Sequence, residues 1–506
     1  MLSWIIATGA LAVTPGPCKL PEGVRPAQPR PAWVYEAVST THPLRIHWID
    51  PAAETRAMQA LAAAELSWDI QVTQMGFRAP LLPDLADGEE FDIYMAPIGW
   101  GYAYVTADEW PYVDPVPGDG FNGASAYMVI DEGLSEAWID SYIAHEFQHV
   151  SQYATDFSEW TLPIWESVAT AAQEWTLGWP ASDWDYDVNG FQAVPWAPTV
   201  LADQYELVGT FGAMRAYNFE YGGALWVMHL DRTYGTGDGA LGVALWQNAA
   251  QEGYPNEPDA LDAVAATAGT TVGGFLSTLA RDRWLVGPEW DTRGLFEAQY
   301  WSEGDIPSHD TIATPALPAT WTPSEPPMVV GQAFVDIDLE ALDPAKDLRI
   351  VARSDGGALS GLTVLWWRTD GTAGDAVADG VNPEIRVPAG DLDRVVVAVS
   401  HAGHPSWDGD DDAYQEGDHV VDFDLSDPLP PPPPTTTPPG GTTAPPPTDP
   451  PTDPSDPTDP GTTPTNDGDS ADPPSEDAGK GCKCDQSGTG SWGLWLGALA
   501  LVRRRR

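Results

Sequence analysis

Cysteine is scarce in this sequence, and the middle of the chain has none. Cys18 stands near the N-terminus, and Cys482 and Cys484 stand close to the C-terminus. No disulfide bond can therefore cross-link the central part of the chain, which must be held together by packed apolar cores. A length of 506 residues with 42% apolar residues is enough for two or three such cores.

Basic residues are also few. The chain has 23 lysines and arginines against 75 aspartates and glutamates, which gives a formal charge of −52. A surface this acidic repels nucleic acid and anionic lipid, so we expect neither as a partner. The ordinary consequence of such a charge is solubility, and it says little about chemistry.

Apolar runs long enough to span a bilayer are missing as well. Residues 2–13 form a short run with an Ala10-Leu11-Ala12 cleavage site. This run predicts a signal peptide over residues 1–12, and therefore export, although no basic residues precede it. A second short run, residues 492–502, ends in four arginines.

The composition changes along the chain and predicts an α+β protein. We expect a mostly helical domain with a small N-terminal sheet over residues 41–320, and a small β-sandwich over residues 328–425. Residues 13–40 are proline-rich and predict an extended leader. Residues 428–480 are almost wholly Pro, Thr, Asp and Gly, so we expect a disordered stalk there. Residues 481–506 form a separate C-terminal segment.

Hydrophobic periodicity locates the elements inside the two domains. In the first domain it predicts strands over residues 42–49, 91–95 and 126–130, and helices over residues 54–77, 135–154, 161–178 and 219–235. In the second domain it predicts strands over residues 333–339, 347–352, 362–367, 394–399 and 419–423. Turn signals separate the strands of the second domain, as is typical of a sandwich.

The sharpest motif is His145-Glu146-Phe147-Gln148-His149, on a predicted helix whose start Ser135 can cap. Residues i and i+4 share a helix face, so both imidazoles can bind one metal ion. A zinc site with three protein ligands keeps a fourth position for water. Glu146 is then placed to accept the proton of that water as a general base without being a ligand. The plainer alternative is that both histidines are polar residues of a core helix.

The third ligand decides the class of site. A metzincin-like pattern would need glycine at position 152 and histidine at position 155, but the sequence has Gln152 and Thr155, which excludes that class. Asp156 follows the motif closely and is one candidate, because an aspartate at such a place completes some zinc sites.

A second helix supplies the other candidate through a resemblance. It opens with Trp165-Glu166-Ser167-Val168-Ala169, and His-Glu-x-x-His followed by Trp-Glu-x-x-Ala is similar to the gluzincin family of metallopeptidases. The resemblance implies a zincin-like fold, Zn²⁺ as cofactor, and Glu166 as the third zinc ligand beside the two histidines.

Further roles follow from the same resemblance. It implies that residues 126–130 form the edge strand beside the substrate, and that Tyr221 or His229, on the helix over residues 219–235, contacts the oxyanion. The chain departs from the thermolysin-like pattern at Thr170, where an aspartate would support a histidine, so that support must come from elsewhere.

The C-terminal segment combines Cys482 and Cys484 with an apolar run and four terminal arginines. This order of elements resembles the myxobacterial sorting signal called MYXO-CTERM. The resemblance implies processing near the cysteines and display on the cell surface, with the proline-rich stalk as a spacer. A plain tail anchor is the alternative, and either way membrane contact would be limited to this segment.

The sequence therefore predicts a secreted or surface-displayed zinc metallopeptidase. We expect His145, His149 and Glu166 to bind Zn²⁺, Glu146 and Tyr221 to be catalytic, and a protein or peptide to be the substrate. We expect the chain to be a monomer. The alternative is a surface binding or adhesion protein with a catalytically degenerate zincin-like domain, which would have no need of Glu146.

Overall fold

The computed structural model describes residues 30–429, apart from residues 83–89, 100–101, 109–114, 158, 160–161, 251–259, 341, 355–356 and 404–414. The described part contains helices and several sheets, which confirms the α+β class. The expected signal peptide, most of the leader, the stalk and the C-terminal segment lie outside the described residues, so these remain predictions.

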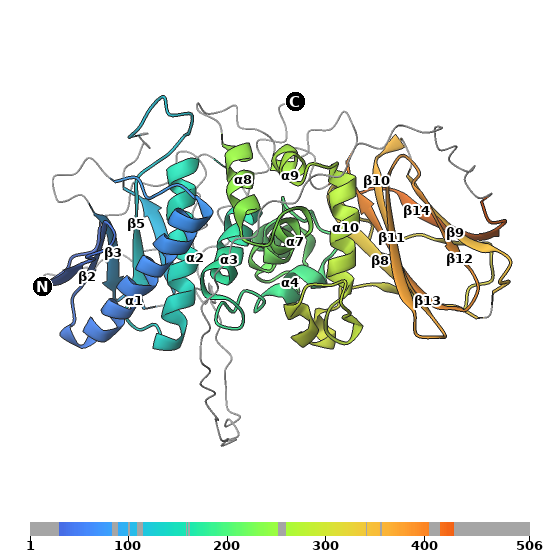
Figure 1. The fold of residues 1–506 in the computed structure, drawn as a ribbon, viewed down its shortest axis with the longest axis horizontal. Helices are drawn as coiled ribbons and strands as arrows, with labels where there is room; N and C mark the ends of the chain where they lie inside the picture. Colours follow the sequence, from blue (N-terminus) through green and yellow to red (C-terminus); the bar gives the residue numbers. More distant parts are fainter. Residues whose placement is uncertain are drawn as a thin grey trace, which may run out of the picture. The chain divides into compact units, whose positions relative to one another are not determined.

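The chain first forms a five-stranded sheet in the order β1-β2-β3-β5-β4 (Figure 1). Its strands are β1 (Tyr35–Val38), β2 (Leu44–Trp48), β3 (Phe91–Ala96), β4 (Ala103–Ala107) and β5 (Ala126–Asp131). Strands β2, β3 and β5 are parallel, whereas β1 and β4 pair antiparallel at the two edges. The three strands predicted in this region are confirmed. The expectation that residues 126–130 form the edge strand is wrong, because β4 lies outside β5 and pairs with it antiparallel.

One face of this sheet packs against helices α1 (Glu54–Ser67) and α2 (Glu136–Thr155) (Figure 1). Alternate strand side chains enter the shared core, among them Ile46, Ile93 and Met128, which are fully buried. A π-helical turn, Trp68–Met75, extends α1. Helix α2, which carries the histidine motif, is therefore supported along its length by the sheet.

The opposite face of the sheet is covered by the segment that precedes β1. The Arg30 guanidinium pairs with Asp92 and with Asp108, the latter at 2.6 Å. The Trp33 ring packs on the His47 ring, with centroids 4.6 Å apart. Residues 30–34 thus pack on the sheet and residues 35–38 form its edge strand β1, so the expected leader over residues 13–40 is wrong for residues 30–38.

The remaining helices of the first part follow without a further sheet. They are α3 (Leu162–Leu177), α4 (Val188–Ala193), α5 (Gln204–Phe211), α6 (Phe219–Gly222), α7 (Ala224–Tyr234), α8 (Ala240–Ala249), α9 (Ala260–Ala268) and α10 (Val272–Trp284). Short 3₁₀ turns add Pro51–Ala53, Gly287–Glu289, Glu297–Tyr300 and Glu303–Asp305. The helix predicted over residues 219–235 is observed as α6 and α7, which meet at Gly223.

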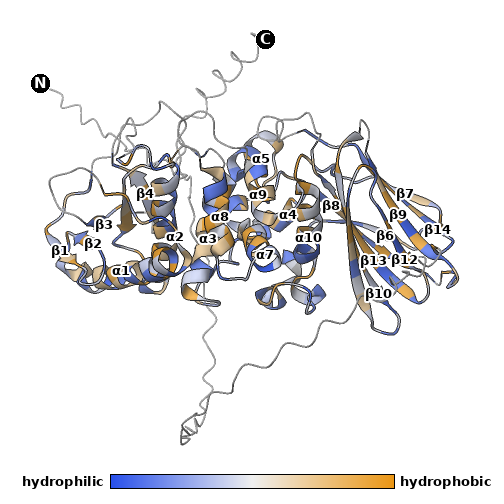
Figure 2. Cartoon of the chain, turned by 45° about the horizontal axis from the view of Figure 1, so that its top comes forward, coloured by the Kyte–Doolittle hydropathy of each residue, from blue (hydrophilic) through white to orange (hydrophobic). Residues whose placement is uncertain are grey.

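Two further sheets lie face to face in the C-terminal part, in the orders β11-β10-β13-β8-β6 and β12-β9-β14-β7. Val335, Val364 and Val397 of the first sheet share one buried core with Ile350 and Phe423 of the second. In Figure 2, hydrophilic and hydrophobic residues both occur along the strands of these sheets. This part of the chain is a β-sandwich.

The sandwich strands are β6 (Asp310–Ala313), β7 (Ala319–Trp321), β8 (Gln332–Asp338), β9 (Asp347–Ser354), β10 (Ser360–Arg368), β11 (Ala373–Gly380), β12 (Glu384–Pro388), β13 (Leu392–His401) and β14 (His419–Ser426). The five predicted strands are confirmed as β8, β9, β10, β13 and β14. Strands β6 and β7 pair with β8 and β14, although they precede residue 328. They are too short to produce a periodic signal.

Helix α10 connects the helical part to the sandwich. Ala280, Trp284 and Leu285 form a buried cluster with Phe334 and with residues of β10 and β13. The outer face of the first sandwich sheet is therefore covered by a helix, which explains why β10 and β13 are apolar on both faces. The two parts are packed together through this helix.

The buried Arg283 of α10 strengthens the same junction. Its guanidinium donates to Gln192 Oε1 at 2.8 Å, to Gln332 Oε1 at 3.1 Å and to the Phe191 carbonyl at 2.9 Å. Burial lowers the pKa of Arg283 to about 9.

Among the described residues, no single helix is long and apolar enough to cross a membrane. The segments Leu261–Ala268 and Val272–Trp284, which are bent by 77° relative to each other, meet the requirement only as a pair.

Candidate metal centre

Helix α2 presents the two histidines of the motif. It runs from Glu136 to Thr155, and His145 and His149 lie one turn apart on the same face. Ser135 is at the N-cap position with an extended backbone, but its side chain accepts no capping hydrogen bond. Ser135 therefore occupies the predicted N-cap position, but the expected side-chain cap is not formed.

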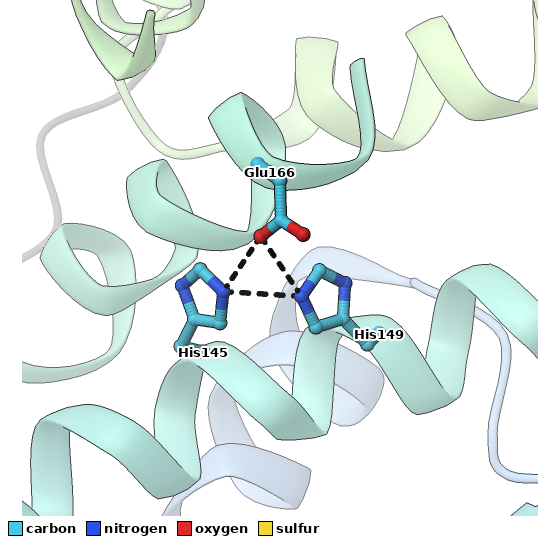
Figure 3. Close-up of side chains that lie close together, drawn as sticks. All are labelled: His145, His149 and Glu166. Atoms are coloured by element: carbon cyan, nitrogen blue, oxygen red, sulfur yellow. Dashed lines mark hydrogen bonds and ion pairs between the residues drawn. The ribbon is translucent and has the colours of Figure 1, made fainter. Parts of the chain in front are cut away.

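Helix α3 brings the glutamate to the histidines. Pro163 lies in its first turn, where no intrahelical N–H bond is needed, and the helix gives way to Gly178 at a φ of +72°. Helix α3 packs directly on α2, so that Glu166 faces the gap between the two imidazoles (Figure 3). Thr161, the expected N-cap, lies outside the described residues.

Three ligand atoms converge between these helices. The Nε2 atoms of His145 and His149 are 3.0 Å apart, and Glu166 Oε2 lies 3.2 Å from the first and 3.4 Å from the second (Figure 3). A tetrahedral zinc ion with bonds of about 2.0–2.1 Å holds its ligand atoms about 3.3 Å apart. The observed spacings fit such an ion, and all three side chains are buried.

The protonation of the histidines follows from their other ring nitrogens. His149 Nδ1 lies 2.6 Å from Gln152 Oε1, and His145 Nδ1 lies 3.2 Å from Gln173 Oε1. An amide oxygen only accepts, so each Nδ1 must carry the hydrogen. Exchanging the oxygen and nitrogen of either side-chain amide would break a second hydrogen bond. Gln152 Nε2 donates to the Trp165 carbonyl at 3.0 Å, and Gln173 Nε2 donates to the Ser182 carbonyl at 2.8 Å.

Each neutral imidazole therefore points a bare Nε2 lone pair at the other and at a carboxylate. Burial opposes ionisation of Glu166; when the two imidazoles are instead protonated at Nε2 as well, their positive charge and N–H groups outweigh the burial and lower the pKa of Glu166 to about 2. Three electron-pair donors in contact repel one another unless a cation lies between them. The group of His145, His149 and Glu166 can hold a metal ion, and its donor set of two imidazoles and one carboxylate is one that zinc accepts.

Glu146 lies beside this group without belonging to it. Burial raises the pKa of Glu146 to about 8, and the charges of His145 and Glu166 act on it. Its Oε2 atom makes no hydrogen bond with any residue that the structure describes. Glu146 is thus a carboxyl group next to the metal group, and a cation bound there would favour its ionised form.

Tyr221 is also brought to the site. Its ring stacks on that of His145, with centroids 5.8 Å apart and planes 23° apart, and it is partly exposed.

Ser167, the neighbour of Glu166, fixes the position of helix α3. Its hydroxyl donates to the Glu220 carbonyl at 2.7 Å and accepts from Trp226 Nε1 at 3.1 Å.

The other two candidates are not part of the group. His229 is fully buried, and its Nδ1 and Nε2 lie 2.6 Å from Asp282 and 3.0 Å from Thr278. These partners make it a core residue between α7 and α10. Asp156 is buried at the C-terminal end of α2, and the metal-binding group found among the described residues does not include it.

Both glutamines and one acidic neighbour of the histidines were not predicted from the sequence. Gln152 lies three residues after His149, so the spacing i, i+3 could have identified it. Gln173 lies 28 residues from His145 and meets it only through the packing of α3 on α2. Asp187 accepts from Asn218 Nδ2 at 2.6 Å, and its pKa, which burial raises to about 6, is lowered in part by His145. Nothing in the local sequence marks either contact.

Comparison with known proteins does not identify a family. No family model matches the chain, and no curated protein matches it. The pre-peptidase C-terminal domain of collagenase from Bacillus anthracis is 14% identical, with a TM-score of 0.15 over 24% of this chain and 95% of that domain. CorA, a surface-associated copper-binding protein of Methylomicrobium album BG8, is 10% identical, with a TM-score of 0.16 over 24% of this chain and 98% of that protein. Likeness of this degree carries no conclusion about function.

Proposed function

We propose that this chain is a zinc-dependent peptidase with a zincin-like first part. The observation that supports it best is the convergence of the Nε2 atoms of His145 and His149 and an oxygen of Glu166 at tetrahedral spacing, with the carboxyl group of Glu146 beside them. Zinc bound there would act as a Lewis acid and lower the pKa of a coordinated water toward neutrality.

The residues of the chain then have distinct tasks. Glu146 accepts the proton of the attacking water and returns it to the leaving amine. The Tyr221 hydroxyl donates a hydrogen bond to the carbonyl oxygen of the substrate as negative charge develops on it. His145, His149 and Glu166 hold the ion and take no part in proton transfer.

The test of this proposal separates metal binding from hydrolysis. Glu146→Gln keeps the size of the side chain but removes the base, so we expect zinc content to be unchanged and peptide hydrolysis to fall by about 10²–10⁴-fold. The assay uses the full chain, unfolded casein and a quenched peptide library, with a chelator control. An active Glu146→Gln variant would refute the mechanism. A wild-type chain that holds zinc and cleaves nothing would be a binding protein.

We also propose that the chain is exported and displayed on the cell surface. The signal-peptide-like start and the C-terminal run of cysteines, apolar residues and arginines support this. Deletion of residues 481–506 should move the protein from the cell surface to the medium. Unchanged fractionation would mean that this segment is not the sorting signal.

A further inference from the structure

Both histidines of the metal group rest on glutamines. Gln152 Oε1 accepts from His149 Nδ1 at 2.6 Å, and Gln173 Oε1 accepts from His145 Nδ1 at 3.2 Å. The two glutamines are 1% and 9% exposed, so bulk water competes little for these bonds. The orientation of each imidazole therefore depends on one buried neutral amide.

The chemistry of these positions requires an amide. Each glutamine must accept from an imidazole N–H and also donate to a backbone carbonyl, that of Trp165 for Gln152 and that of Ser182 for Gln173. A carboxylate at either position would place its second oxygen next to that carbonyl oxygen, with no hydrogen to donate. An aliphatic side chain would leave a buried donor and a buried acceptor unpaired.

Gln152 also links two of the proposed ligands. It joins the imidazole of His149 to the backbone of Trp165, which immediately precedes Glu166 in α3. One side chain thus fixes a histidine from α2 relative to the start of the helix that supplies the carboxylate.

We infer that Gln152 and Gln173 are the positioning residues of the metal centre, which hold both imidazoles with Nε2 bare and aimed at the ion. Because the amides are neutral, Glu166 supplies the only negative charge among these contacts, and a bound divalent ion keeps a net positive charge. The inference rests on the metal-binding part of the proposed function and not on peptide hydrolysis.

The experiment compares three glutamine-to-methionine variants of the full chain. Gln152→Met and Gln173→Met keep the length of the side chain and remove the amide. Gln71→Met is the matched control, because Gln71 is also buried and joins α2 to α3, through the Ala144 carbonyl and Thr176, without touching a histidine. Zn²⁺ affinity is measured by chelator competition, and the geometry of the site by the visible absorption of bound Co²⁺.

We expect Gln152→Met and Gln173→Met each to weaken Zn²⁺ binding by about 10–100-fold and to change the Co²⁺ spectrum. Gln71→Met should do neither. In wild-type protein with ¹⁵N-labelled histidine, both ligand histidines should be protonated at Nδ1, and this measurement does not depend on the folding of a variant.

Equal Zn²⁺ affinity and equal Co²⁺ spectra in all three variants would overturn the inference and leave the metal site intact. A loss of affinity in Gln71→Met as large as in the others would show a merely structural role. Histidines protonated at Nε2 in the metal-free protein would contradict the tautomers. A wild-type chain that binds neither ion would refute both this inference and the proposed function.

Discussion

Replacement of Glu166 by glutamine tests the proposed ligand set most directly. The Glu166 carboxylate is 2% exposed and lies beside both imidazoles, so a metal ion held there would compensate its buried charge. Binding of structural zinc amounts to about 10–16 kcal/mol over four ligands, or about 3 kcal/mol for each. Glu166→Gln should therefore weaken Zn²⁺ binding by about 10²–10³-fold.

The matched control is Asp156→Asn, because Asp156 is the competing candidate for the same role. Both side chains are buried acids close to the histidine helix, but only Glu166 has an oxygen within 3.4 Å of both imidazoles. Zinc content after dialysis and chelator competition on the full chain provide the assay. Retention of zinc by Glu166→Gln together with its loss from Asp156→Asn would refute the assignment.

Three further predictions concern the stability of the fold. Arg30→Met should lower the free energy of unfolding by about 2 kcal/mol in urea titrations, because it removes the charged hydrogen bonds of Arg30 to Asp108 and Asp92. No change would mean that the segment before β1 is not part of the fold. Burial lowers the pKa of His401 to about 4 and that of His419 to about 3. As the pH falls below about 6.5, these two histidines bind protons in the unfolded chain but not in the folded sandwich. The pair should therefore lower the free energy of unfolding by about 4 kcal/mol between pH 7.5 and pH 5. The double variant His401→Leu/His419→Leu should lose that part of the pH dependence. Arg283→Leu leaves three buried acceptors unpaired and should lower the midpoint of thermal unfolding, at a cost of at least about 3 kcal/mol; an unchanged midpoint would show that water or other groups satisfy them.

The strands and helices that the sequence predicts well are those that place apolar side chains at a regular spacing in the large core. Strand β3 and helix α2 alternate or repeat cleanly because the same core accepts their apolar side chains. Strand β11 is different: its sequence, Ala-Gly-Asp-Ala-Val-Ala-Asp-Gly, has hardly any large apolar residue, and it exists through its antiparallel register with β10. Edge strands of this kind depend on a neighbour that local sequence does not specify.

The same division holds for the metal centre. His145, His149 and Glu146 are identifiable because one helix fixes their relative positions. Glu166 could be proposed only through a resemblance, since its approach depends on how α3 packs against α2. Gln173 had no signal at all, because glutamine occurs at many buried and exposed positions and its meaning here comes entirely from the atom it contacts.

Helix α10 limits where the chain can be truncated or cleaved by a protease without loss of the fold. One of its faces completes the helical core and the other covers the sandwich, so separating the two parts would expose both to water. A fragment that ends near residue 310 would therefore tend to aggregate, and proteolysis at the junction would destroy the molecule and not activate it. If the C-terminal segment tethers the protein to a cell, shedding an intact molecule requires a cut beyond Ser426, where the last strand ends.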